Sequence, residues 1–229
     1  MRRKTCETIE RLYPKKPGDG ASKRTEHSAK HLVPSDFDLE ARSFCAAASG
    51  YIQHIDVDGL IKFAAEHDLL IRVGTRPGRF VTDRTTVFAV YPGGRVSDDV
   101  AEGLRRTFFV GKERTPEQDL EFSIRRIVEI AQRALSPGVN DPTTAMYCID
   151  RLGEALVRLA GRDIHSSARF DEKRRLRVLT EVISLQEISC TAFAAIARYG
   201  LGDADVVSRL LETMDLLARA ASAGATRIY

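Results

Sequence analysis

The chain has 229 residues, 43% of them hydrophobic and 29% charged, with a formal net charge of +3. This composition supports a buried core and excludes a wholly disordered chain, a collagen, a coiled-coil rod and a disulfide scaffold. No apolar run approaches the roughly 18 residues that span a bilayer, and no apolar segment follows the basic N-terminus. We therefore expect a soluble, cytoplasmic, globular protein of one or two domains.

Positive charge is concentrated at the start of the chain. Residues 1–30 contain nine Lys or Arg against four Asp or Glu, a net charge of +5, which leaves −2 for the remainder. Residues 1–40 are polar, and we interpret them as a disordered or loosely attached basic arm with one helical turn near 6–12. The arm is either a solvated leader or a tether to phosphates or an anionic membrane surface. No basic surface interleaved with aromatic residues follows, which argues against specific nucleic-acid binding.

Residues 41–111 have the pattern of a small β-rich unit with inserted helices. Alternating or β-branched runs predict strands at 51–55, 69–73, 80–81, 86–91 and 108–110. Asp56 or Asp58 can cap a helix over about 59–66, and Ser97 can cap another. The order of strands and turns is similar to that of a barrel-sandwich hybrid, the fold of biotinyl and lipoyl carriers. No lysine stands where such a carrier bears its prosthetic group, so no cofactor arm is expected.

Residues 112–229 have helical periodicity almost throughout. Thr115, Pro116 and Gln118 have the pattern of an N-cap, a first-turn proline and a capping box. Apolar positions at helical spacing predict four helices, at about 116–135, 142–161, 172–198 and 203–222. The whole chain is therefore predicted to be α+β, a β-rich, barrel-sandwich-like unit followed by a helical bundle of about four helices.

The joint between the first two of these helices, the Ser136–Thr144 elbow, is the most distinctive segment. It exposes a helix N-terminus, where backbone N–H groups and threonine hydroxyls favour an anion. Asp141 opposes this, because it already occupies the cap position and adds negative charge. Two interpretations stay open, a rigid interhelical turn and a ligand site. The candidate ligand-binding residues for the second are Arg125, Arg126, Asn140, Asp141, Thr143 and Thr144.

No residue pattern indicates a known catalytic chemistry or a metal centre. The helix dipole explains Glu117, Asp119 and Glu121 in the first turns of a helix, with a divalent metal as the weaker alternative. His27 and His31 have a spacing that binds metal on a helix, but they lie in the basic arm. The four cysteines are far apart and form no C-x-x-C motif. We therefore predict no catalytic residue, no metal and no cofactor, and favour a non-enzyme.

Four stretches of the chain resemble one protein family. They are SGYIQHIDVDGL, RPGRFV, ERTPEQDLEFSIRRIVEIAQRALSPGVNDPTTAMYCIDRLG and AFAAIARYGLGDADVVSRLLETMDLLA. Together they are similar to the soluble region of a bacterial family of predicted membrane proteins, domain of unknown function 2254, over about Ala41 to Ala218. The role of that family is unassigned, so the resemblance supplies no catalytic residue. Its members typically have transmembrane helices before this region, where this chain has the basic arm. The resemblance thus implies a stand-alone version, a fragment, or a chain that works with a membrane subunit.

We derive two hypotheses for the function. The first is a non-enzymatic cytoplasmic module for assembly or regulation, with a membrane protein or the membrane surface as its partner. A homo-oligomer would then form through a second apolar stripe on the third predicted helix, unless the same residues pack into a wide core: Val178, Val182, Leu185 and Ala192. The second hypothesis is a small-ligand sensor or an enzyme with its site at the Ser136–Thr144 elbow.

Overall fold

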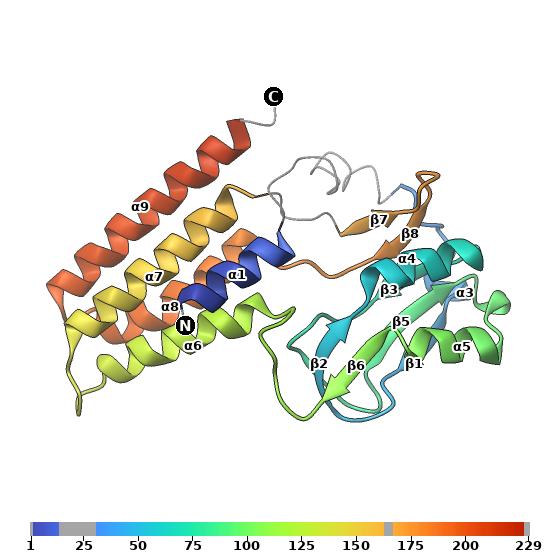
Figure 1. Ribbon diagram of the computed structural model, residues 1–229, viewed down its shortest axis with the longest axis horizontal. Helices are drawn as coiled ribbons and strands as arrows, with labels where there is room; N and C mark the ends of the chain where they lie inside the picture. Colours follow the sequence, from blue (N-terminus) through green and yellow to red (C-terminus); the bar gives the residue numbers. More distant parts are fainter. Residues whose placement is uncertain (1, 14–30, 163–166, 227–229) are drawn as a thin grey trace. The chain divides into compact units, whose positions relative to one another are not determined.

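The computed structural model describes residues 2–13, 31–162 and 167–226, and it divides into two compact units (Figure 1). The helical unit comprises Met1–Pro17, Leu120–Ile164 and Ile183–Tyr229, and the mixed unit comprises Gly18–Asp119 and His165–Val182. Each unit is therefore built from segments that are far apart in the sequence.

The larger sheet of the mixed unit has five strands in the order β1-β5-β3-β8-β7. These strands are β1 (Arg42–Cys45), β3 (Leu70–Val73), β5 (Thr86–Tyr91), β7 (Ala168–Phe170) and β8 (Leu176–Leu179). Neighbours are antiparallel except for β3 and β8, which are parallel. Ile71 of β3 lies opposite Val90 of β5 and Val178 of β8, and all three side chains are fully buried.

The smaller sheet of the mixed unit has three antiparallel strands in the order β4-β2-β6. These are β2 (Gly50–Ile55), β4 (Phe80–Val81) and β6 (Phe108–Gly111). Ile52 and Phe108 belong to the same core as the larger sheet, where Phe88 meets Phe108 edge to face with 5.2 Å between ring centroids. The helices α4 (Val57–Glu66) and α5 (Asp98–Arg105) bury Leu60 and Leu104 in this core. Two short elements complete the unit, α3 (Phe37–Glu40) and the 3-10 helix η1 (Gly93–Arg95).

The helical unit has one core of aliphatic side chains. Its helices are α1 (Arg2–Leu12), α6 (Leu120–Ala134), α7 (Pro142–Ala160), α8 (Leu185–Gly200) and α9 (Ala204–Thr226). The fully buried members of the core include Ile124, Ile149, Leu152 and Leu156. Helix α1 contacts α6 and α7, and its Ile9 is buried in the same core. Residues 14–30 of the predicted basic arm at 1–40, which include His27, lie outside the described residues, whereas 31–40 are described and contain α3 with Phe37 buried.

Helices α7 and α9 lie side by side and run in the same direction (Figure 1). Asp150 of α7 binds Arg209 of α9 at 3.0 Å, and one turn further along both helices Gly153 faces Thr213. A Cβ atom on Gly153 would lie 2.5 Å from Cγ2 of Thr213. The glycine therefore sets how closely the two helices approach.

The α+β class and most of the predicted elements are confirmed. The strands at 51–55, 69–73, 80–81, 86–91 and 108–110 correspond to β2, β3, β4, β5 and β6. Four predicted caps bind the N–H groups of a first helical turn, namely Asp56, Ser97, Asp141 and Asp203. The described strands form two open sheets and no closed barrel.

The predicted helix over 172–198 is wrong in its first half. This stretch completes the β7–β8 hairpin, and α8 begins only at Leu185. Arg174 has a φ of 60° at the hairpin turn, a conformation that no α-helix contains. Strand β8 pairs with β7 in the hairpin and with β3, and a partner as distant in sequence as β3 leaves no trace in local periodicity. Val178, which we expected either on a second apolar stripe or in a wide helical core, is therefore buried in the sheet instead.

The predicted capping box at Thr115 is also wrong, because α6 begins at Leu120. Gln118 instead pairs its side-chain amide with the backbone of Ile55 at the end of β2. Its Oε1 accepts from the Ile55 N–H at 2.9 Å, and its Nε2 donates to the Ile55 carbonyl at 3.2 Å. Asp119, expected in the first turns of the helix, is buried and accepts a 2.8 Å hydrogen bond from Arg114.

Candidate functional site

Backbone hydrogen bonds close the predicted elbow between α6 and α7. The N–H groups of Val139 and Asn140 both donate to the carbonyl of Ser136, at 3.0 and 2.9 Å. The N–H of Asp141 donates to the carbonyl of Ala134 at 2.8 Å. Asn140 has a φ of 47°, in the left-handed region that Asn tolerates better than most residues. The elbow is thus a well-bonded link between two helices.

Asp141 is the N-cap of α7, and Thr144 occupies both of its carboxylate oxygens. Oδ1 accepts from the Thr144 N–H at 3.0 Å, and Oδ2 accepts from the Thr144 hydroxyl at 2.6 Å. Both bonds hold the pKa of Asp141 below its ordinary value, and the bond from the Thr144 hydroxyl has the larger effect. A charged carboxylate already satisfies the positive end of the helix dipole, so it disfavours a second anion there.

The structure does not bring the two predicted arginines to the elbow. Arg125 lies nine residues before the end of α6 at Ala134, which is about 14 Å along the helix axis. It binds Glu121 one turn earlier at 2.7 Å, and the guanidinium of Arg126 lies 5.8 Å from the ring centroid of Phe122. The elbow itself holds the other four candidates, Asn140, Asp141, Thr143 and Thr144. A ligand site at the elbow stays a prediction.

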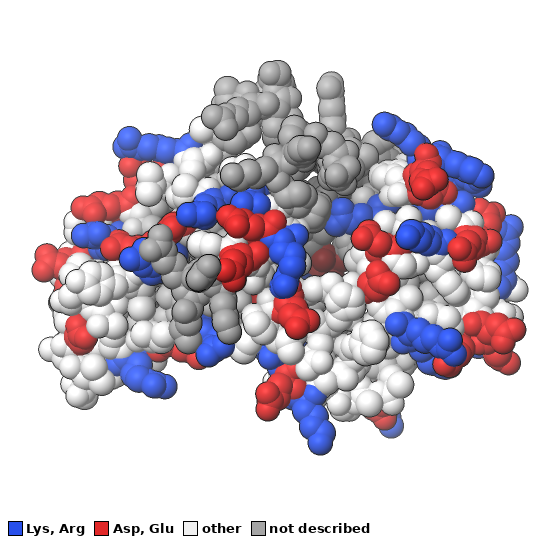
Figure 2. Space-filling model, in the orientation of Figure 1, with Lys and Arg blue, Asp and Glu red and all other residues white. Residues whose placement is uncertain are grey.

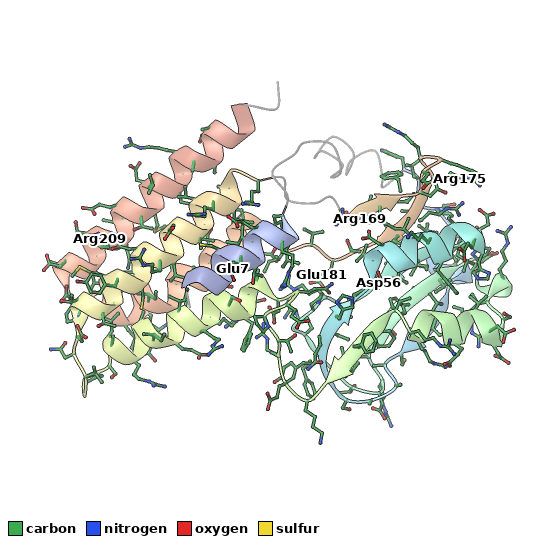
Figure 3. All side chains as sticks on the ribbon, in the orientation of Figure 1. Glu7, Asp56, Arg169, Arg175, Glu181 and Arg209 are labelled. Atoms are coloured by element: carbon green, nitrogen blue, oxygen red, sulfur yellow. The ribbon has the colours of Figure 1, made fainter. Side chains whose placement is uncertain are left out.

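A cluster of charged side chains, which the sequence analysis missed, joins the β7–β8 hairpin to the end of α4. Asp68 accepts from Arg95 at 2.7 Å and from Arg177 at 3.0 Å, and Arg175 lies 3.5 Å from it. Asp171 accepts a further bond from Arg177 at 2.9 Å. We call these five residues the arginine cluster, and Figure 3 labels Arg175 at the hairpin.

Arg177 is the buried centre of the arginine cluster. Its side chain is 6% exposed, and it also donates to the carbonyl of Leu69 at 3.3 Å. Burial alone would lower its pKa, but the hydrogen bonds to Asp171 and Asp68 outweigh burial and raise it. The two carboxylates therefore keep a buried cation charged, and the loss of either would leave that charge poorly paired.

The end of α4 positions Asp68. The N–H of Leu69 returns to the carbonyl of Ala64 at 2.8 Å, and Asp68 has a φ of 51°. Glycine usually takes this position at a helix C-terminus, because it adopts positive φ without strain. Hydrogen bonds from Arg95 and Arg177 hold the pKa of Asp68 below its ordinary value, and the bond from Arg95 has the larger effect. The aspartate thus accepts an unfavourable backbone conformation in a place where three arginines share its carboxylate.

Two more cations, Lys173 and Arg174, lie at the turn of the hairpin. Asp171 closes this turn, because its carbonyl accepts from the Arg174 N–H and its Oδ1 accepts from the Arg175 N–H, both at 2.9 Å. The side chains of Lys173 and Arg174 are exposed, and neither makes an ion pair with a described residue. Figure 2 shows blue side chains gathered at the hairpin turn, at the upper right of the view.

The sequence did contain a signal for this cluster. The run Lys173–Arg177 places four cations within five residues, so a helix through it would carry charge on nearly every side. A hairpin resolves this conflict by turning Arg177 inward and the other cations outward.

Helix α9 carries three of the exposed large hydrophobic side chains of the helical unit, Leu211, Met214 and Leu216. Its buried side chains follow one another at steps of four, three and four residues and form a buried seam of Val206, Leu210, Thr213 and Leu217. One residue after each of these lies a second set with the same spacing, which we call the α9 stripe: Val207, Leu211, Met214 and Ala218. In this stripe Leu211 is 63% exposed and Met214 is 51% exposed.

Comparison with known proteins places the chain in a family. Residues 1–215 match the family described as predicted membrane protein, DUF2254. The chain belongs to this family. This confirms the resemblance found in the sequence, and the match shows no specific role for the DUF2254 chain.

Three curated relatives of the DUF2254 chain are uncharacterised mycobacterial proteins. One from Mycobacterium tuberculosis strain CDC 1551 is 31% identical over 224 residues, which cover 96% of this chain and 41% of the relative. Those from Mycobacterium bovis and from Mycobacterium tuberculosis strain H37Rv are each 30% identical with the same coverage. The chain thus spans about two fifths of the length of these relatives. No solved structure matches it.

Membrane-spanning helices and metal-binding clusters are both absent from the described part of the DUF2254 chain. None of its helices is long and apolar enough to cross a membrane. In the same residues, no three His, Cys, Asp or Glu side chains gather in a way that would hold a metal ion.

Proposed function

We propose that this DUF2254 chain is a non-enzymatic cytoplasmic module for the assembly of a membrane protein, and that two copies associate through their α9 stripes. The observation that carries the proposal is the row of exposed apolar side chains on α9, with Leu211 63% and Met214 51% exposed. Large apolar side chains in one contiguous row on a surface are typical of an interaction site.

The spacing of the α9 stripe favours a helix as its partner. Apolar residues that repeat at steps of four and three form the seam of two packed helices. The same helix already uses this spacing in its buried seam, where it packs on α7. A second copy of the chain offers an identical stripe, and twofold contacts that use one patch from each copy are the commonest in homo-oligomers.

The family supports the membrane setting of this proposal. Its description is that of a predicted membrane protein, and the chain spans only 41% of the relative from strain CDC 1551. The alternative site at the elbow has less support, because Asp141 and Thr144 are bound to each other.

The test is the molar mass of the full chain by size-exclusion chromatography with light scattering. We expect the native chain to have twice its monomer mass of 25.4 kDa. A variant with both Leu211→Glu and Met214→Glu should elute at the monomer mass, because it places four carboxylates in the twofold contact.

Leu216→Glu is the matched control. Leu216 is 55% exposed on the same helix, but it lies two residues after Met214 and so about 200° around the helix axis. The control variant should keep the dimer mass. The proposal is refuted if the native chain is a monomer. It is also refuted if the double variant keeps the dimer mass with unchanged helix content, or if the control variant dissociates as much as the double variant.

A further inference from the structure

We propose that the β7–β8 hairpin binds an anionic phospholipid surface through Lys173 and Arg174 at its turn, with Arg175 and Arg95 beside them. The proposal concerns the mixed unit and does not depend on dimer formation by α9. It rests on the charge, the fixed geometry and the projecting position of the hairpin.

The hairpin and the arginine cluster together carry an excess of positive charge. They contain six cationic side chains, Arg169 of β7 included, against three carboxylates, those of Asp68, Asp171 and Glu172, which gives a net charge of +3. Arg177 is buried, so the cations that reach solvent are those of the turn and its rim. Arg175 and Arg95 are 55% and 54% exposed even though both contact Asp68. One carboxylate shared among three guanidinium groups leaves donors free to meet further anions.

The arginine cluster holds the cations in place before any ligand arrives. Arg177 links Asp171 in the hairpin to Asp68 at the end of α4. The N–H groups of Arg174 and Arg175 are both bound to Asp171. Because the turn is fixed from within, binding costs only the freedom of the outer side chains.

The form of the hairpin favours an extended surface over a small ion. Its turn projects at one end of the mixed unit (Figure 1), and the cations spread around the turn instead of lining a hollow (Figure 2). A small phosphate ion is bound best in a concave site that encloses it, whereas a projecting turn can meet many headgroups at once. The family's description as a predicted membrane protein is consistent with such a surface nearby.

The test is co-sedimentation of the full chain with phosphatidylcholine vesicles that do or do not contain phosphatidylserine. The native chain should pellet only with the anionic vesicles and should be released as salt rises. A variant with Lys173→Ala and Arg174→Ala should bind about thirtyfold more weakly, since each cation near an anionic surface contributes about 1 kcal/mol. Thermal unfolding of the variant shows whether it remains folded.

Arg105→Ala with Arg106→Ala is the matched control. These arginines at the end of α5 are 54% and 78% exposed in the same unit. The control variant therefore loses the same amount of charge at another place. It should bind the vesicles within about twofold of the native chain, because cations away from the membrane surface contribute little to binding.

The proposal fails if the hairpin variant pellets like the native chain or if both variants lose binding equally. It also fails if inorganic phosphate at constant ionic strength displaces the chain from vesicles. That result would assign the site to free phosphate. The hairpin variant can also be tested with a single-stranded oligonucleotide. If it loses binding to the oligonucleotide but still binds the anionic vesicles, the hairpin is a nucleic-acid site and the proposal is overturned.

Discussion

Gly153 of α7 controls the contact with α9 through the absence of one methyl group. Its virtual Cβ would lie 2.5 Å from Cγ2 of Thr213, which is a buried residue. Ala at this position gains about 1 kcal/mol of helix propensity, but overpacking of a close contact costs about 1–3 kcal/mol. We expect Gly153→Ala to lower the free energy of unfolding by about 1 kcal/mol, measured by urea denaturation.

The second substitution Thr213→Ser identifies the cause. It removes the Cγ2 atom that the new methyl group would meet, so the double variant should regain most of the lost stability. Gly138→Ala is the control, because no atom lies within 4 Å of its virtual Cβ. If Gly153→Ala is as stable as the native chain, the close approach of α7 and α9 is not as tight as described.

Asp68 and Asp171 make the free energy of unfolding of the mixed unit depend on pH in the acid range. Burial raises the pKa of Asp171, but hydrogen bonds from Arg175 and Arg177 outweigh burial and lower it, and those from Arg95 and Arg177 lower that of Asp68. With pKa values below those of the unfolded chain, the stabilisation is complete above about pH 4 and is lost as pH falls through the lowered folded values.

Urea unfolding from neutral pH down to acid pH measures this dependence. Asp68→Asn keeps the tolerance of positive φ but removes the charge, so it should be less stable than the native chain at pH 7. The difference should shrink as the pH falls below about 4, because the unfolded native chain then binds a proton at Asp68 that the folded chain binds only at lower pH. A difference that stays constant down to acid pH would contradict the role assigned to Asp68.

Sequence reasoning at the scale of single residues succeeds where the signal is local. The caps at Ser97, Asp141 and Asp203 were predictable, because a cap binds N–H groups two or three residues away. The run of cations at 173–177 was visible, but its pairing with Asp68 was not predictable, because Asp68 and Arg177 lie more than a hundred residues apart and meet only through the sheet. The candidate arginines at 125 and 126 were grouped with the elbow as nearby polar groups on the preceding helix, but nearly ten residues of α6 separate them from it.

Helix α8 begins with a capping box that fixes the start of the element. The hydroxyl of Ser184 accepts from the Glu187 N–H at 3.1 Å, and the Glu187 carboxylate accepts from the Ser184 N–H at 2.7 Å. We expect Ser184→Ala to lower the free energy of unfolding by about 1 kcal/mol in urea denaturation. Ser189→Ala in the same helix is the control and should be neutral, because its hydroxyl bonds only the Leu185 carbonyl one turn back. Equal losses in both variants would contradict the capping role.

Whether a segment forms a helix or a strand was easier to predict than which strand it pairs with. The strands from β2 to β6 have alternating or β-branched sequences of their own, and all were identified. Strand β8 was read as helix, although Ser184 and Glu187 have the spacing of a helix start. Its strand conformation depends on the parallel pairing with β3, a partner that local sequence does not reveal.

In the whole molecule, each compact unit combines segments that are separated in the sequence by residues of the other unit. The mixed unit recruits β7 and β8, and the helical unit recruits α1. The two proposed contact surfaces follow from this arrangement, since the hairpin belongs to one unit and the α9 stripe to the other. A second apolar stripe was expected, but on residues 178–192. Its first member proved to be a core residue of β8, and the exposed row lies on the next helix.

Sedimentation equilibrium of the unmodified full chain, over a wide range of concentration, shows whether two copies associate as proposed. Association through the α9 stripe predicts an average mass that approaches twice 25.4 kDa at high concentration and falls towards 25.4 kDa on dilution. A mass of 25.4 kDa at every concentration would contradict the claim that this chain assembles through α9.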